Sequence, residues 1–237
     1  MERFFLTLLF MNSTTATQDS FVNSPLRELE AILLTDTGKR FNRDWIFRHV
    51  HYRFETGKSY AITGPNGSGK STLLQAIAGS LHLSEGRLSY ETPNGDTDTI
   101  EAENFYRYIS IAAPYLELIE EMTAKEFLLF HSRFKALNQS VSLEQILEEI
   151  GLQKAMDKQI RYFSSGMKQR IKLAQAIFSN VPVLLLDEPC TNLDKPGYDL
   201  YHTLIDKYCK GKLIVVSSND PNEMDFCTEK ISILDYK

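Results

Sequence analysis

Residues 64–71 read GPNGSGKS, and this stretch decides the fold. It follows a short apolar segment, SYAIT at 59–63, and precedes apolar residues at helical spacing, Leu73, Leu74 and Ile77. A strand, a glycine-rich turn and a helix in this order are typical of a phosphate-binding loop. Small residues let backbone N–H groups close around an anion at the positive end of the helix dipole. We therefore predict an α/β domain organised around this loop.

Within the loop, two side chains have expected roles in holding a phosphorylated ligand. The Lys70 ammonium is expected to reach the β- and γ-phosphates, and the Ser71 hydroxyl to ligate Mg²⁺. The ligand-contacting residues predicted from the loop are Gly64, Pro65, Asn66, Gly67, Ser68, Gly69, Lys70, Ser71 and Thr72.

A second stretch, VPVLLLDEP at 181–189, reads as a buried strand that ends in two acids. An acid at the end of such a strand is costly unless it is paired or lies near a metal. Asp187 therefore suits a magnesium contact, through water, beside the phosphate loop. Glu188 is expected to point toward the γ-phosphate and to orient or deprotonate the attacking water.

The rest of the chain alternates between strand and helix patterns. We expect a strand at 29–36, a turn at 38–45 and a second strand at 46–54. Residues 87–100 suggest an antiparallel hairpin, and 122–150 shows helical spacing of apolar residues. This alternation predicts a mainly parallel sheet.

Composition is that of a folded protein of 237 residues, with 43% hydrophobic and 24% charged residues. The net charge of −5 comes with no block of like charges, which argues against nucleic acid as a main partner. The three cysteines, Cys190, Cys209 and Cys227, are few and not spaced for zinc, so we interpret them as reduced thiols.

The N-terminal stretch needs separate treatment. FFLTLLF at 4–10 is too short to span a bilayer, and Glu2 weakens its likeness to a signal peptide. We expect residues 1–28 to be a disordered or loosely docked tail, with a start at Met11 or a membrane-touching role as alternatives. Because no other stretch could cross a membrane, we expect any membrane association to go through a partner.

A third stretch, RYFSSGMKQR at 161–170, carries a family resemblance. It resembles the signature of the ATP-binding domain of ABC transporters. Phe163–Met167 occupies the positions of the signature sequence Leu-Ser-Gly-Gly-Gln. TNLD at 191–194 is similar to the D-loop that follows the acidic strand in this family. The resemblance covers roughly residues 29–235, and its elements come in the family's order.

The resemblance implies a P-loop NTPase fold with a mainly parallel core sheet, an antiparallel β subdomain and an inserted helical subdomain at about 115–165. The whole domain would cover 29–237 and bind ATP with Mg²⁺. Two such domains would sit head to tail, so that the signature of one contacts ATP held by the other. The residues implied at the nucleotide in this way are Ser164, Ser165, Gly166 and Asp194, with Phe41 stacking on adenine.

Two positions depart from the family's pattern. The family has a glutamine after the strand near 108–113, where this chain has Ala113 or Pro114; Glu117 is a possible but less favoured substitute. Where the family has a histidine that contacts the γ-phosphate, this chain has Asn219. An asparagine amide can donate a hydrogen bond but cannot take up a proton.

These features together predict an ATPase subunit that drives a separate transmembrane permease from the cytoplasmic face of the cell membrane and dimerises, as a homodimer, on binding ATP. Two alternatives remain open. One is a soluble ATPase of the kind that serves iron–sulfur assembly. The other is an ATP-gated interaction module with weak hydrolysis, which the two departures favour.

Overall fold

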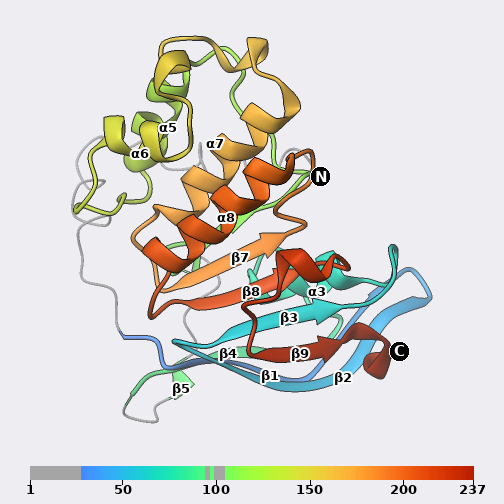
Figure 1. The fold of residues 1–237 in the computed structure, drawn as a ribbon. Coiled ribbons are helices and arrows are strands. Elements are labelled where there is room, and N and C mark those ends of the chain that lie inside the picture. The colour runs from blue at the N-terminus through green and yellow to red at the C-terminus, as the bar shows by residue number, and fades with distance from the viewer. Residues whose placement is uncertain (1–27, 94–96, 99–104) are drawn as a thin grey trace.

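Two β-sheets form the frame of the computed structural model, which describes residues 28–93, 97–98 and 105–237 (Figure 1). The parallel sheet has the order β6 (Ile109–Ala112), β7 (Val183–Asp187), β8 (Leu213–Ser217), β3 (Ser59–Thr63) and β9 (Glu229–Ser232). The antiparallel sheet has the order β2 (Asp44–Glu55), β1 (Ala31–Phe41), β4 (Glu85–Glu91) and β5 (Thr97–Asp98). The predicted α/β fold with a parallel core and an antiparallel part is confirmed.

The helices lie on both faces of the parallel sheet. They are α3 (Lys70–Ile77), α5 (Ala124–Ser132), α6 (Leu143–Glu149), α7 (Ser165–Ile177) and α8 (Lys195–Tyr208), with 3₁₀ turns η1 (Gln153–Ala155), η2 (Ile160–Tyr162), η3 (Pro221–Glu223) and η4 (Ile233–Tyr236). On β7, Leu184 and Leu186 join one buried cluster with α5 to α8, whereas Val183 and Leu185 join another with α3 and the antiparallel sheet. Such two-sided burial explains why β7 is apolar throughout.

The stretch at 122–150, where apolar residues recur at helical spacing, contains two short helices, α5 and α6. Each begins at a capping box, in which Thr123 caps α5 and Ser142 caps α6. A reciprocal pair of bonds satisfies two of the free N–H groups at a helix start, so these positions begin helices firmly. The limits of the subdomain at about 115–165 stay a prediction.

The turn expected at 38–45 is present but shorter than predicted, at Asn42 and Arg43. β1 and β2 continue through it as a hairpin and leave only Asn42 and Arg43 between them. Arg40 pairs with Trp45 across the strands, and the guanidinium carbon lies 5.5 Å from the centre of the indole ring. These cross-strand contacts outweigh the polar composition that suggested a longer turn.

The expected tail, except for Glu28, and the middle of the hairpin at 87–100 lie outside the described residues. Among the residues that are described, no helix combines the length and the apolar character needed to cross a bilayer.

Candidate functional site

The carboxyl ends of three neighbouring strands bring the candidate residues together. β3 leads into the glycine-rich loop, β7 ends at Asp187 and β8 leads to Asn219. The register pairs Ser217 with Asp187 on one side and with Ile62 on the other. Ligands of open parallel sheets bind beyond this edge, so the topology supports a single site there.

The glycine-rich loop has the backbone shape that only glycine readily allows. Gly69 has φ 103°, and a Cβ placed on it would lie 2.4 Å from Ile46 Cγ2. Lys70 follows as the first residue of α3, with its ammonium donating to the carbonyl oxygens of Gly64 at 2.8 Å and Pro65 at 3.3 Å. The buried Lys70 ammonium therefore lies within the loop itself, where an anion would meet it.

The hydroxyl of Ser71 donates to Asp187 Oδ1 over 3.0 Å. Asp187 is 2% exposed, and burial raises the pKa of its carboxyl above the ordinary value. A hydroxyl and a buried carboxylate are hard oxygen donors of the kind that Mg²⁺ accepts beside phosphates. A cation here would also compensate the cost of the buried charge, so the residues present fit the metal that the sequence predicted.

Glu188 follows directly and adopts a left-handed backbone, with φ 43°. Its N–H donates to the Ser217 carbonyl oxygen over 2.9 Å, which holds this strained residue at the strand edge. Backbone strain of this kind persists only where neighbouring structure imposes it, and it is common at functional sites.

Behind Glu188 lies a buried acid that sequence reasoning missed. Glu223 is 4% exposed, and one carboxylate oxygen accepts the Cys190 N–H at 2.7 Å. Its other oxygen accepts the Ser218 hydroxyl, while burial raises its pKa. Glu223 thus ties the segment after Glu188 to the segment that carries Asn219. No pattern in the sequence marks Glu223 as part of the site.

Asn219 reaches the glycine-rich loop. Its Nδ2 donates to Asn66 Oδ1 over 3.1 Å, and both residues are exposed at the strand edge. The expected neighbourhood of Asn219 and the phosphate loop is therefore present in the fold.

At the position of the expected glutamine, the structure offers a different polar group. Ala113 is fully buried, and Pro114 has no donor. The next residue, Tyr115, is 45% exposed and hydrogen-bonded to Gln75 on α3, and partial desolvation together with the Asp187 carboxylate raises the pKa of its hydroxyl. The Tyr115 hydroxyl therefore lies on the Asp187 side of the site, a position that the family resemblance did not indicate.

The signature residues lie at the start of α7. Ser164 Oγ accepts the Met167 N–H over 3.3 Å and so caps the helix. A Cβ on Gly166 would lie 3.2 Å from the Asn192 carbonyl oxygen, so the helix start packs against the segment at 191–194. Ser165 is the first, exposed residue of the helix.

Asp194 makes a second contact between the segment at 191–194 and α7. It caps α8 by accepting the Gly197 N–H at 3.1 Å, and Arg170 Nη2 on α7 lies 3.6 Å from the same Oδ1. The structure therefore groups Ser164, Gly166 and Asp194 as one surface.

Phe41 sits at the end of β1, beside the hairpin turn. The residue is 47% exposed, and the Lys39 ammonium lies 4.9 Å from the ring centre. Trp45, the alternative aromatic, has the guanidinium groups of Arg40 and Arg48 over its ring at 5.5 and 4.4 Å. Phe41 is thus the freer ring for stacking.

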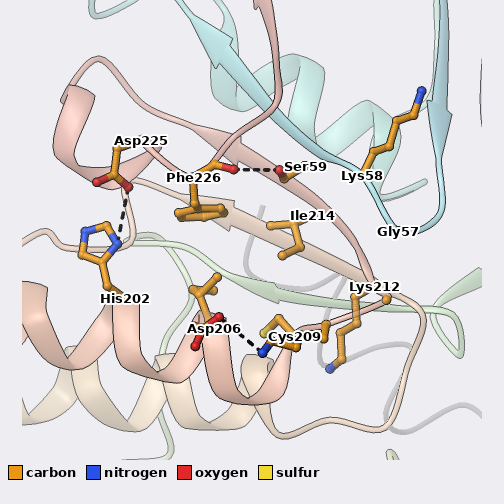
Figure 2. Close-up of a pocket in the computed structure, with 13 residues that line it drawn as sticks. Gly57, Lys58, Ser59, His202, Asp206, Cys209, Lys212, Ile214, Asp225 and Phe226 are labelled. Atoms are coloured by element: carbon orange, nitrogen blue, oxygen red, sulfur yellow. Dashed lines mark hydrogen bonds and ion pairs between the residues drawn. The ribbon is translucent and has the colours of Figure 1, made fainter.

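A separate hollow of about 720 Å³ lies at the opposite edge of the parallel sheet (Figure 2). It opens beside Ser59 at the start of β3 and Lys212 before β8, with Ile214 and Phe226 among its apolar residues. Because it lies at the amino ends of the strands, it is distinct from the candidate nucleotide site.

The comparison with protein families decides which family this geometry represents. The family model described as ABC transporter matches residues 47–191, which is more than half of the chain. The chain belongs to the ABC transporter family. The matched range contains the glycine-rich loop, the signature and the acidic strand, so the family resemblance seen in the sequence is confirmed.

Relatives of this ABC protein include named transport subunits. The cytochrome c biogenesis ATP-binding export protein CcmA of Mesorhizobium japonicum is 32% identical over 174 residues, covering 73% of this chain and 83% of that protein. The ABC transporter ATP-binding protein NatA of Bacillus subtilis is 29% identical, covering 86% of this chain and 85% of that protein. A solved ATP-binding subunit of an ABC transporter superposes with a TM-score of 0.73 at 23% identity and covers 85% of each chain, which supports the fold.

Proposed function

We propose that this ABC protein binds and hydrolyses Mg-ATP at a head-to-tail dimer interface and thereby drives a separate membrane permease from the cytoplasmic face. The observation that carries the proposal is the contact of Ser71 with Asp187 at 3.0 Å, beside the loop-bound Lys70 ammonium. The phosphate-binding loop with Lys70 therefore lies directly beside two oxygen ligands, from Ser71 and Asp187, that suit a divalent cation.

The chain's own residues divide the work of hydrolysis among them. The loop N–H groups and Lys70 hold the phosphates, and Ser71 and Asp187 would hold Mg²⁺, which neutralises charge on the phosphate oxygens when bound. Glu188 orients the attacking water and accepts its proton. The Asn219 amide donates a hydrogen bond toward the γ-phosphate and replaces the proton-accepting histidine of the family.

The signature surface would complete the site of a second copy. Ser164 keeps its hydroxyl proton free while it caps α7 by accepting a backbone N–H. The helix start also presents backbone donors and the positive end of its dipole. Both features suit the triphosphate of ATP held by the partner subunit.

Coupling to a permease is supported by what the relatives are named. Several carry "export" or "ABC transporter ATP-binding protein" in their names. A second candidate is an ATP-gated interaction module with slow hydrolysis. It is favoured by the buried Ala113 and by Pro114, which offer no metal-binding side chain where the family has glutamine.

The test is Glu188→Gln in the purified protein. We expect loss of steady-state ATP hydrolysis by roughly 10²-fold or more, the usual size for removing a general base. ATP should then hold the variant as a dimer, measured by light scattering after gel filtration. Glu148→Gln, an exposed acid on α6, is the matched control and should behave as wild type. Full turnover by Glu188→Gln would refute the role of Glu188, and very slow turnover by wild type with normal ATP-dependent dimers would favour the second candidate.

A further inference from the structure

The side chain of Lys237 lies behind the phosphate loop. Its ammonium donates to the Ser68 carbonyl oxygen over 2.5 Å and to the Ile46 carbonyl oxygen over 2.8 Å. Ser68 belongs to the loop, and Ile46 belongs to β2 of the antiparallel sheet. One cation thus joins three segments that are distant in sequence.

Neighbouring contacts make this junction tight. A Cβ on Gly64 would lie 2.7 Å from Ile233 Cγ2 in the segment that leads to Lys237, and a Cβ on Gly69 would lie 2.4 Å from Ile46 Cγ2. The loop is therefore backed on one side by η4 and on the other by β2. Lys237 directly follows η4 and bonds to Ile46 of β2, so it links the two segments that back the loop.

The geometry of the peptide group gives this contact a consequence for anion binding. The Ser68 carbonyl and the Gly69 N–H belong to one planar trans peptide, so they point in opposite directions. An ammonium that holds the carbonyl at the rear of the loop therefore directs the Gly69 N–H toward the opposite side. The same positive charge polarises the amide and strengthens its N–H as a donor.

We propose that Lys237 is a positioning residue for the nucleotide: it sets the orientation of the loop donors and their spacing from the β1–β2 hairpin that carries Phe41. The proposal rests on the proposed nucleotide site. Lys237 acts through the Ser68–Gly69 peptide and the Ile46 carbonyl, and it contacts no part of the hydrolytic residues Glu188 and Asn219 in this arrangement.

This role predicts a specific pattern of effects. The loop donors and the hairpin serve any nucleotide that carries adenine and a β-phosphate. Loss of the ammonium should therefore weaken the binding of ATP and of ADP by the same factor and leave the kcat of ATP hydrolysis unchanged. A general loss of structure would instead lower kcat and the melting temperature together.

The experiment compares wild type, Lys237→Met, Lys237→Arg and Lys230→Met. Lys230 is an exposed lysine on β9 and serves as the matched control. Affinities for ATP and ADP are measured by equilibrium dialysis, with melting temperature and kcat as further readouts. We expect Lys237→Met to raise both dissociation constants about fivefold to tenfold, the scale of one ordinary hydrogen bond, because Lys237 is exposed and its charge is partly screened by water. Lys237→Arg should stay near wild type.

Two outcomes would overturn the inference, and they are distinguishable from each other. Lys237 has no positioning role if wild type binds ATP and Lys237→Met binds ATP and ADP as tightly as wild type does. The same conclusion follows if Lys230→Met loses as much nucleotide affinity as Lys237→Met. If wild type binds neither nucleotide, the proposed function fails and the inference fails with it.

Discussion

The side-chain amide of Asn219 donates to the side-chain oxygen of Asn66 over 3.1 Å and so joins the end of β8 to the phosphate loop. The two residues are separated by most of the chain, and the parallel pairing of β3 with β8 brings them together. An amide in this position is a neutral donor across the physiological pH range, whereas the histidine that the family resemblance implies here can gain a proton near neutral pH.

Replacing Asn219 with alanine should slow ATP hydrolysis while ATP affinity is largely kept. Loss of a preorganised donor commonly costs about 10²–10³ in kcat, and a donor that is neutral and exposed should fall at or below the lower end of that range. Steady-state turnover and equilibrium ATP binding measure the two effects separately. Asn222→Ala, an exposed asparagine three residues later, is the control. Wild-type turnover by Asn219→Ala would show that the amide takes no part in the reaction.

Ser164 should have two separable roles, as a helix cap and as a contact to the partner's ATP. Ser142 caps α6 with the same geometry, accepting the Gln145 N–H over 3.2 Å. Alanine at either position should lower the free energy of unfolding by about 1 kcal/mol, the usual cost of a lost cap. Only Ser164→Ala should also weaken ATP-dependent dimer formation. Denaturant unfolding and light scattering test this, and equal dimerisation by both variants would leave Ser164 with a capping role alone.

His131 should make the protein less stable as the pH falls. Burial, aided by the Lys135 charge, lowers the pKa of His131 from 6.5 to about 4. Its Nε2 lies 2.9 Å from Ser179 Oγ, which donates its own proton to the Gln175 carbonyl oxygen, so Nε2 carries the hydrogen. The unfolded chain binds a proton at His131 between pH 6.5 and 4 that the folded chain does not.

The stability that neutral His131 provides is therefore present above about pH 6.5 and is lost as the pH falls toward 4. The loss between pH 7 and 5 should be about 1–2 kcal/mol in the free energy of unfolding. His131→Gln keeps a donor to Ser179 and should reduce this pH dependence, measured as the difference between urea unfolding curves. A variant with the same pH dependence as wild type would exclude His131 as the cause.

Much of the site could be predicted because its residues follow local patterns. The run at 64–71 combines glycines, lysine and serine at fixed spacing, and Asp187 and Glu188 end an apolar strand. Such features depend on backbone conformation and on the period of side-chain burial, which neighbours in sequence control. The turn expected at 38–45 was located correctly but predicted too long, since cross-strand pairs extend both strands of the hairpin into its polar residues.

Residues that act through distant contacts could not be predicted in this way. Glu223 lies in an unremarkable polar segment, yet it bonds to the Cys190 N–H and to Ser218. Tyr115 follows the position where the family resemblance implies a glutamine. It is hydrogen-bonded to Gln75, and the Asp187 charge raises the pKa of its hydroxyl. Lys237 shows no pattern in sequence that links it to the phosphate loop.

By itself, the sequence determined the phosphate loop and the acidic strand end, because each depends on residues within one turn or strand. The order of these motifs along the chain indicated the ABC transporter family. The tertiary structure decided which side chains support that loop and its acids. Lys237, Glu223 and Tyr115 reach the site only after strands far apart in the chain have paired. Their partners are carbonyl oxygens, backbone N–H groups and buried carboxylates whose positions exist only in the folded sheet.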